Sequence, residues 1–321
     1  TIHEVVEKYA PYIPDPLPED IRSGNSLPGL SQAVQEIHFP ESDQSLQAAR
    51  RRLAFDELFL LQMGVLKQKR QWESREGMVF DPPDDWLQAQ LKTLPFKLTS
   101  AQDKALKQIR EDLRSGTPMN RLLQGDVGSG KTVLAALAAQ IVIREGAQAA
   151  LLAPTSILAE QHYQSLIGLL TGTEDGLKED QISLLIGATP ESEKAVIREG
   201  LAAGKIKLVI GTHALLQDPV KFQKLQLAIV DEQHRFGVEQ RGTLRQKGDN
   251  PHLLVMTATP IPRSLALTIY GDLELTVIDE LPPGRQPVET HVLYPSELER
   301  AYSLVRRQVD LGNQAFIIYP L

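Results

Sequence analysis

The sequence predicts an α/β protein whose main domain is a parallel β-sheet covered by helices. Between residues 96 and 279, short β-rich apolar runs alternate with helical segments, and this alternation is typical of parallel sheets with helices on both faces. One of these runs, residues 121–124, leads through a glycine-rich loop into a helical segment at residues 132–144. That strand–loop–helix order belongs to the same class of fold.

Residues 1–92 are expected to form a mostly helical region before the sheet. A proline-rich opening, residues 11–18, leads into an amphipathic stretch from about Ser45 to Arg70. We expect this stretch to be a helix that packs on something larger. Its apolar side chains recur at roughly helical spacing, at Leu46, Ala49, Leu53, Leu60, Leu61 and Val65. Pro82 and Pro83 mark the boundary that follows.

Residues 93–280 are expected to form the sheet domain. The predicted strands are residues 121–124, 149–153, 182–186, 206–210, 225–230 and 253–257. Ligands of parallel sheets bind beyond the carboxyl ends of the strands. The residues that follow these strands are therefore the candidate site residues.

Residues 281–321 are expected to be a linker and the start of a second, truncated sheet domain. A stretch rich in proline and glycine, residues 281–284, precedes a predicted strand at 291–293, a helix at about 296–309 and a strand at 314–319. One strand–helix–strand unit is too small to be stable by itself. We therefore expect this region to be only the beginning of a domain.

The composition excludes several classes of function. The chain has 321 residues, a formal net charge of −7 and no cysteine, which excludes disulfides, thiolate nucleophiles and cysteine-ligated metal clusters. The acidic balance argues against a protein that coats nucleic acid, although a local surface can still grip a strand. No apolar run approaches the ~20 residues of a membrane-spanning helix, and no secretory signal opens the chain. We expect a soluble, cytoplasmic protein with no membrane partner.

The glycine-rich loop after the first predicted strand satisfies the pattern G-x-x-x-x-G-K-[ST]. Its residues are Gly125, Asp126, Val127, Gly128, Ser129, Gly130, Lys131 and Thr132. The glycines let backbone N–H groups surround phosphate oxygens, and the following helix N-terminus adds positive potential. Lys131 is expected on the β- and γ-phosphates of a nucleotide and Thr132 on Mg²⁺. The alternative is a glycine-rich turn that only starts a helix.

Two adjacent carboxylates, Asp231 and Glu232, follow the apolar strand predicted at residues 225–230. They are expected to complete the nucleotide site. Asp231 would hold Mg²⁺, and Glu232 would orient or deprotonate the attacking water. Together with Lys131 they are the candidate catalytic residues. The alternative is a solvated strand end without a role.

Gln102 has two interpretations. Thr99, with Gln102 three residues later, forms a capping-box pattern that would simply start a helix. The functional interpretation has Gln102 hydrogen-bonding an adenine, with Phe96 nearby. The residues alone favour the cap.

Further segments resemble a known family. Residues 153–161 (APTSILAEQ), 211–213 (GTH), 231–234 (DEQH) and 257–259 (TAT) stand in the order of the superfamily 2 helicase motifs. This resemblance extends from residue 96 to about residue 279. The longer strings at 125–132, 231–238 (DEQHRFGV) and 256–264 (MTATPIPRS) resemble the RecG family of branched-DNA helicases, as do residues 37–40 (IHFP) and 49–58.

The resemblance implies a RecA-like fold for both sheet domains and ATP as the nucleotide. Residues 1–92 would then follow a fork-binding wedge domain that this chain lacks. Gln102 would contact adenine, which reverses the local preference. The residues expected toward the nucleic-acid strand, or between it and the nucleotide, are Pro154, Thr155, Gly211, Thr212, His213, His234, Thr257 and Thr259.

Local alternatives stay open for several of these residues. Thr155 is also a good helix cap. His213 and His234 could be ordinary hydrogen-bonded histidines, and residues 50–52, three arginines, could be a solvated helix face. Gln233 stands where members of the superfamily often carry alanine, and we interpret it as a RecG-like variant.

The resemblance implies an ATP-dependent DNA helicase that acts on branched double-stranded DNA, such as stalled forks and Holliday junctions, in recombination and repair. We expect the protein to be a monomer. The chain lacks the second-domain arginine that would stabilise the transition state, so alone it is expected to be nearly inactive. The alternatives are another superfamily 2 translocase, such as a transcription-repair coupling factor or an RNA helicase, and a nucleotide-gated regulatory module. A metabolic P-loop kinase is disfavoured, because it would not need residues 211–213 and 257–259.

Overall fold

The computed structural model describes residues 1–172, 176–232, 238–259, 271, 273–280 and 289–318, with backbone only at 238–241. The chain divides into two compact units, Thr1–Pro282 and Pro283–Leu321. Within the described part of the chain, no helix is both long and apolar enough to cross a membrane.

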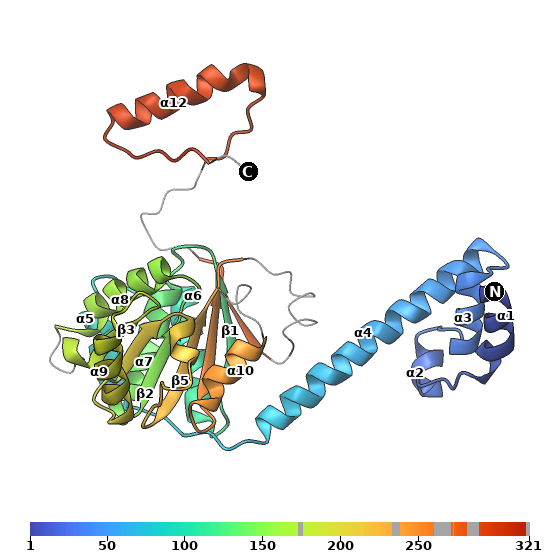
Figure 1. The fold of residues 1–321 in the computed structure, drawn as a ribbon, viewed down its shortest axis with the longest axis horizontal. Coiled ribbons are helices and arrows are strands. Elements are labelled where there is room, and N and C mark those ends of the chain that lie inside the picture. The colour runs from blue at the N-terminus through green and yellow to red at the C-terminus, as the bar shows by residue number, and fades with distance from the viewer. Residues whose placement is uncertain (173–175, 233–237, 260–270, 272, 281–288, 319–321) are drawn as a thin grey trace. The chain divides into compact units, whose positions relative to one another are not determined.

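The first unit contains a seven-stranded sheet in the order β3-β4-β2-β5-β6-β1-β7, in which every paired neighbour is parallel (Figure 1). The strands are β1 (Asn120–Gly125), β2 (Gln148–Leu152), β3 (Ile182–Leu185), β4 (Leu208–Gly211), β5 (Leu225–Asp231), β6 (His252–Thr257) and β7 (Glu274–Ile278). The predicted α/β fold with a parallel sheet is confirmed.

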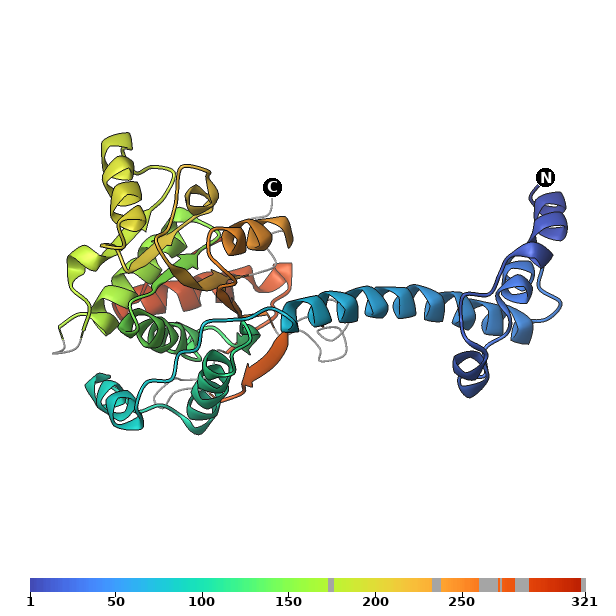
Figure 2. The same cartoon turned by 90° about the horizontal axis from the view of Figure 1, so that it is seen from below.

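Helices cover both faces of this sheet (Figures 1 and 2). One face packs against α5 (Asp84–Thr93), α6 (Ser100–Arg114), α7 (Lys131–Arg144) and α8 (Ser156–Leu170). The other packs against α9 (Glu191–Ala202), the short 3-10 helix η3 (His213–Leu216) and α10 (Val238–Gln246). Neighbouring strand residues alternate between the two cores, as Leu122 and Leu123 do, because successive side chains of a strand point to opposite faces.

All six predicted strands are present, with boundaries shifted by at most two residues. Strand β7 was not predicted. It lies at the edge of the sheet beside β1, and its side chains are partly exposed, with Val277 at 47%. An edge strand needs fewer apolar residues than a central one, so its apolar run is too weak to be recognised.

The N-terminal part of this unit is helical, as predicted. Its elements are α1 (Ile2–Tyr9), η1 (Ala10–Tyr12), α2 (Glu19–Gly24), α3 (Leu30–His38) and α4 (Asp43–Glu73). Ser42 and Ser45 form a capping box that starts α4. Ala49 of α4 is buried and Ala33 of α3 is fully buried, because α3 and α4 pack on each other.

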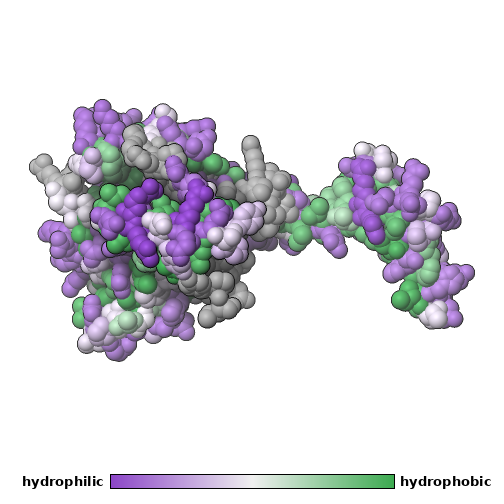
Figure 3. Space-filling model, turned by 90° about the horizontal axis from the view of Figure 1, so that it is seen from above, coloured by the Kyte–Doolittle hydropathy of each residue, from purple (hydrophilic) through white to green (hydrophobic). Residues whose placement is uncertain are grey.

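The middle of α4, within the stretch expected to pack on something larger, is largely exposed. Leu60 and Leu61 are 65% and 58% exposed, and the surface there is hydrophobic (Figure 3). At its other end α4 is anchored by Trp72, which is buried and donates from Nε1 to the Pro118 carbonyl at 2.9 Å. Apolar spacing predicts a helix, but it does not say which turns find a partner among the described residues.

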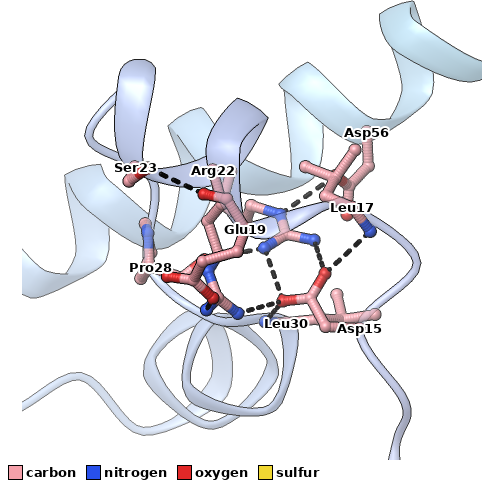
Figure 4. Close-up of polar contacts among 9 residues, drawn as sticks. Asp15, Leu17, Glu19, Arg22, Ser23, Pro28, Leu30 and Asp56 are labelled. Atoms are coloured by element: carbon pink, nitrogen blue, oxygen red, sulfur yellow. Dashed lines mark hydrogen bonds and ion pairs between the residues drawn. The ribbon is translucent and has the colours of Figure 1, made fainter.

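A buried arginine ties the N-terminal helices together (Figure 4). Arg52 is fully buried and donates to both carboxylate oxygens of Asp15, at 2.9 and 2.6 Å, and to Asp56 and the Pro28 carbonyl. Arg22 also donates to Asp15, at 3.1 Å. The Arg52 guanidinium holds the pKa of Asp15 well below its ordinary value. Arg52 thereby fastens the segment before α2 to α4.

The interpretation of residues 50–52 as a solvated helix face is right for two of the three arginines. Arg50 and Arg51 are exposed, whereas Arg52 is not. Successive side chains on a helix point in directions about 100° apart. Arg51 and Arg52 therefore differ although they are adjacent, the first being exposed and the second buried.

The second unit contains the short 3-10 helix η5 (Pro295–Glu297) and α12 (Leu298–Asp310). This confirms the predicted helix. The strands predicted at 291–293 and 314–319 are wrong for 291–293 and 314–318, which are irregular, and residue 319 lies outside the described residues. A strand requires a neighbouring strand to pair with its N–H and C=O groups, and the described part of this unit contains no strand.

His252 is a fully buried titratable group at the start of β6. Its Nδ1 accepts from the Met119 N–H at 2.9 Å, its Nε2 donates to the Met78 carbonyl at 2.8 Å, and its ring packs edge-on against Phe80. Burial lowers the pKa of His252. Because one nitrogen accepts and the other donates, the folded state requires the neutral ring.

Acidification below pH ~6.5, the ordinary pKa of histidine, is expected to lower the free energy of unfolding through His252. The unfolded chain binds a proton that the folded chain does not, which costs up to about 1.4 kcal/mol per pH unit. The free energy of unfolding, measured in urea at several pH values, should therefore fall less steeply with decreasing pH in His252→Gln than in wild type. The exposed His3 supplies the control, His3→Gln, which should keep the wild-type slope. An equal slope in His252→Gln and wild type would contradict the assignment.

Candidate functional site

The phosphate loop connects β1 to α7 and depends on glycine for its shape. Gly128 and Gly130 have φ of 78° and 94°, a left-handed conformation that favours glycine. A Cβ at Gly130 would also collide with the side-chain amide of Gln102. Glycine at these two positions therefore allows a tight turn in which a residue with a side chain would be strained.

The interior of this loop suits phosphate. Ser129 is fully buried, and its Oγ has no hydrogen-bond partner among the described residues. The Asp126 carboxylate accepts from the Val127 N–H at 2.7 Å and so secures the turn. The first N–H groups of α7 have no intrahelical acceptor and give this end of the helix positive potential. A cradle of this kind fits the phosphates of a nucleotide.

The side chain of Lys131 folds back over the loop. Its Nζ donates to the carbonyl oxygens of Gly125 at 2.7 Å and Asp126 at 2.9 Å. The ammonium group is thus held at the loop, where phosphate oxygens can replace the carbonyls as acceptors.

Gln102 forms the capping box and also contacts the phosphate loop. Its Oε1 accepts from the Thr99 N–H at 2.9 Å, and its own N–H donates to Thr99 Oγ1 at 3.3 Å. Its Nε2 donates to the Ser129 carbonyl at 2.7 Å. The capping interpretation is confirmed. The contact with adenine stays a prediction, with Phe96 46% exposed nearby in the chain.

The acidic pair lies at the end of β5, next to β6 and, beyond it, β1. The parallel register aligns Asp231 with Met256, and Gln124 with Thr257. The phosphate loop, the acidic pair and Thr257 therefore emerge at one edge of the sheet. This is the edge at which ligands of parallel sheets bind.

Glu232 contacts the segment that follows β6. It adopts a left-handed φ of 49°, and its Oε1 accepts from the Ala258 N–H at 3.4 Å. Thr257 and Thr259 bond to each other through their hydroxyls at 2.9 Å. A left-handed backbone outside glycine is strained and often marks a functional position.

Asp231 is 7% exposed, and its Oδ2 lies 2.7 Å from Nε2 of His162 on α8. The sequence interpretation did not single out His162. A signal was present, because His162 shares its helical spacing with Ala159, Leu166 and Leu170, all of which are buried. A polar side chain on a buried helix face needs a partner.

The residues predicted toward the nucleic acid follow β2 and β4, which are neighbours with Leu152 opposite Gly211. The Ala153 N–H also donates to the Gly211 carbonyl at 2.8 Å. The structure therefore brings the segment after β2 together with the segment after β4.

These residues differ in access. Pro154 and Thr155 are partly exposed and His213 is exposed, whereas Gly211 and Thr212 are buried. The Thr155 hydroxyl accepts from the Leu158 N–H at 3.3 Å, which confirms the capping alternative. His234 lies outside the described residues.

The oxygen ligands expected for Mg²⁺ are the Thr132 hydroxyl and the Asp231 carboxylate. Mg²⁺ usually takes one or two protein oxygens and completes its shell with water and phosphate. No cluster of three or more histidine, aspartate or glutamate side chains suited to a metal occurs among the described residues. The two-oxygen set fits magnesium bound together with a nucleotide.

Comparison with known proteins gives a consistent result. Residues 99–268 match the family model described as DEAD/DEAH box helicase. The chain is 48% identical over 307 residues to the ATP-dependent DNA helicase RecG of Synechocystis sp., covering 95% of this chain and 36% of the relative. It is 44% identical to that of Bacillus subtilis, covering 100% of this chain and 46% of the relative.

A solved structure of RecG bound to a three-way DNA junction matches the whole chain, with a TM-score of 0.82 and 44% identity, and the match covers 43% of that protein. The chain thus spans less than half the length of the relatives it matches.

Proposed function

Because the chain belongs to the DEAD/DEAH box helicase family and is similar to RecG helicases over almost its whole length, we propose that the full-length protein is an ATP-dependent helicase for branched duplex DNA. Stalled forks and Holliday junctions are the proposed substrates. The main support is the likeness, over 100% of this chain, to a RecG structure bound to a three-way junction.

The nucleotide site would bind and hydrolyse ATP. Lys131 exchanges its carbonyl acceptors for the β- and γ-phosphate oxygens, and the loop around the buried Ser129 surrounds the phosphates with N–H groups. Thr132 and Asp231 would hold Mg²⁺, which neutralises charge on the transferred phosphoryl group. Glu232 orients the attacking water and receives its proton.

Coupling to DNA would use the segments beside this site. The Glu232–Ala258 and Thr257–Thr259 contacts link the water-orienting carboxylate to the end of β6. The residues that would face the phosphate backbone of one strand are Pro154, Thr155, Gly211, Thr212 and His213. Gly211 and Thr212 are buried and would reach the strand only after their loop moves. His234 would respond to the nucleotide state. Movement would follow from two sheet domains opening and closing around ATP.

This chain alone should hydrolyse ATP slowly. Its second unit presents one α-helix and no strand within residues 289–318, and so offers no second sheet to close on the nucleotide. Turnover of the isolated chain close to that of the full-length protein would contradict the two-domain mechanism.

The function is tested by the ATPase activity of the full-length protein with a synthetic three-way fork, linear duplex DNA and single-stranded RNA. We expect the fork to stimulate hydrolysis most, because junction binding would align the two domains. Strongest stimulation by RNA would favour an RNA helicase. Equal stimulation by forks and by linear duplex DNA would favour a translocase of the coupling-factor type. Activity independent of any nucleic acid would instead favour a nucleotide-gated regulatory module.

A further inference from the structure

His162 is a polar side chain on the face of α8 that packs against the sheet. Ala159, Leu166 and Leu170 share this face and are at most 1% exposed, while the side chain of His162 is 12% exposed. An apolar residue would suit such a position. Histidine is tolerated there because its Nε2 lies 2.7 Å from Asp231 Oδ2. This contact gives each of these two atoms a hydrogen-bond partner.

The contact constrains the orientation of the Asp231 carboxylate. An ionised carboxylate can only accept, so Nε2 of His162 is the donor, and 2.7 Å is the separation typical of a charge-assisted hydrogen bond. Partners of this kind orient metal ligands, and replacing them typically costs about 10- to 100-fold in metal affinity or activity.

The position of α8 gives this contact a second consequence. The helix begins at Ser156, directly after Pro154 and Thr155, and Thr155 caps it. His162 lies six residues beyond Ser156, about 9 Å along the axis at 1.5 Å per residue. Because a helix moves as a rigid element, displacement of its first turn by a bound strand would also displace His162.

We propose that His162 is a positioning residue that orients Asp231 and couples the strand-facing end of α8 to the nucleotide site. The proposal rests on the proposed function, since the coupling needs both nucleic acid and ATP. His162 contacts neither ligand itself and acts through Asp231.

The test compares His162→Leu, which keeps the packing but removes the donor, with His162→Gln, which keeps a donor at similar reach. The exposed Gln164 of the same helix supplies the control, Gln164→Leu. In the full-length protein, the Mg²⁺ concentration needed for tight binding of a fluorescent ADP analogue should rise about 10- to 100-fold in His162→Leu. His162→Gln should recover part of this loss, and the control should match wild type.

Fork-stimulated hydrolysis gives the second measurement. In His162→Leu, kcat should fall while the KM for ATP changes little, and the ratio of stimulated to basal rate should shrink. Wild-type Mg²⁺ dependence and stimulation in His162→Leu would overturn the proposal. Equal losses in His162→Leu and His162→Gln with a lowered melting temperature would also overturn it, because they indicate packing alone. Absence of fork stimulation in wild type, with the Mg²⁺ effect still present, would instead reject the proposed function and the coupling, and keep the positioning of Asp231.

Discussion

Replacing Lys131 with alanine is expected to lower the kcat of ATP hydrolysis by about 10²- to 10³-fold, the usual cost of removing one preorganised charge donor from a transition state. Lys131 Nζ already lies at the loop carbonyls of Gly125 and Asp126, so its charge is placed before ATP binds. Alanine leaves the loop glycines unchanged but removes that charge. Steady-state hydrolysis by the full-length protein with saturating fork DNA is the measurement.

The control is Lys104→Ala, which removes the same charge from an exposed position on α6 and should leave kcat unchanged. Fork binding without nucleotide should be equal in both variants, because Lys131 serves the nucleotide. Hydrolysis by Lys131→Ala within a few-fold of wild type would show that the loop is structural and would remove the basis for an ATP-driven motor.

Replacing Arg52 with alanine is expected to destabilise the N-terminal helices by about 3–5 kcal/mol, the cost of breaking a buried ion pair from one side. Asp15, whose side chain is only 19% exposed, would lose two short hydrogen bonds from Arg52 and keep that from Arg22. Urea unfolding followed by circular dichroism should show the loss. Hydrogen exchange should show that the lost protection lies within residues 13–56.

The matched control is Arg51→Ala, at the neighbouring exposed position, which should change the free energy of unfolding by no more than about 0.5 kcal/mol. The pH dependence gives a further check. The pKa of Asp15 is depressed in the folded state, so its stabilisation is present above the ordinary carboxyl pKa of ~3.9 and is lost as the pH falls below it. The difference between Arg52→Ala and wild type should therefore shrink in acid. Equal stabilities of the two alanine variants at neutral pH would contradict the assignment.

Sequence patterns predicted most of the sheet domain because its signals are local. Five of the six predicted strands lie inside the sheet, and the sixth, β3, is a mainly apolar run at its edge. The phosphate loop and the Asp231–Glu232 pair each follow a central strand. Their meeting at one edge follows from the parallel arrangement itself. The missed strand β7 and the absent strands at 291–293 and 314–318 show the limit, because pairing depends on a neighbour that is distant in the chain.

The sequence by itself determined the fold class, the phosphate loop and the resemblance to RecG, since each depends on residues close together in the chain. Only the tertiary structure decided that Arg52 is buried while Arg51 is exposed, that Leu60 and Leu61 find no cover among the described residues, and that His162 meets Asp231. These three outcomes depend on which surfaces pack together. Packing joins residues such as 15 and 52, or 162 and 231, whose separation in the chain leaves no periodic pattern to read.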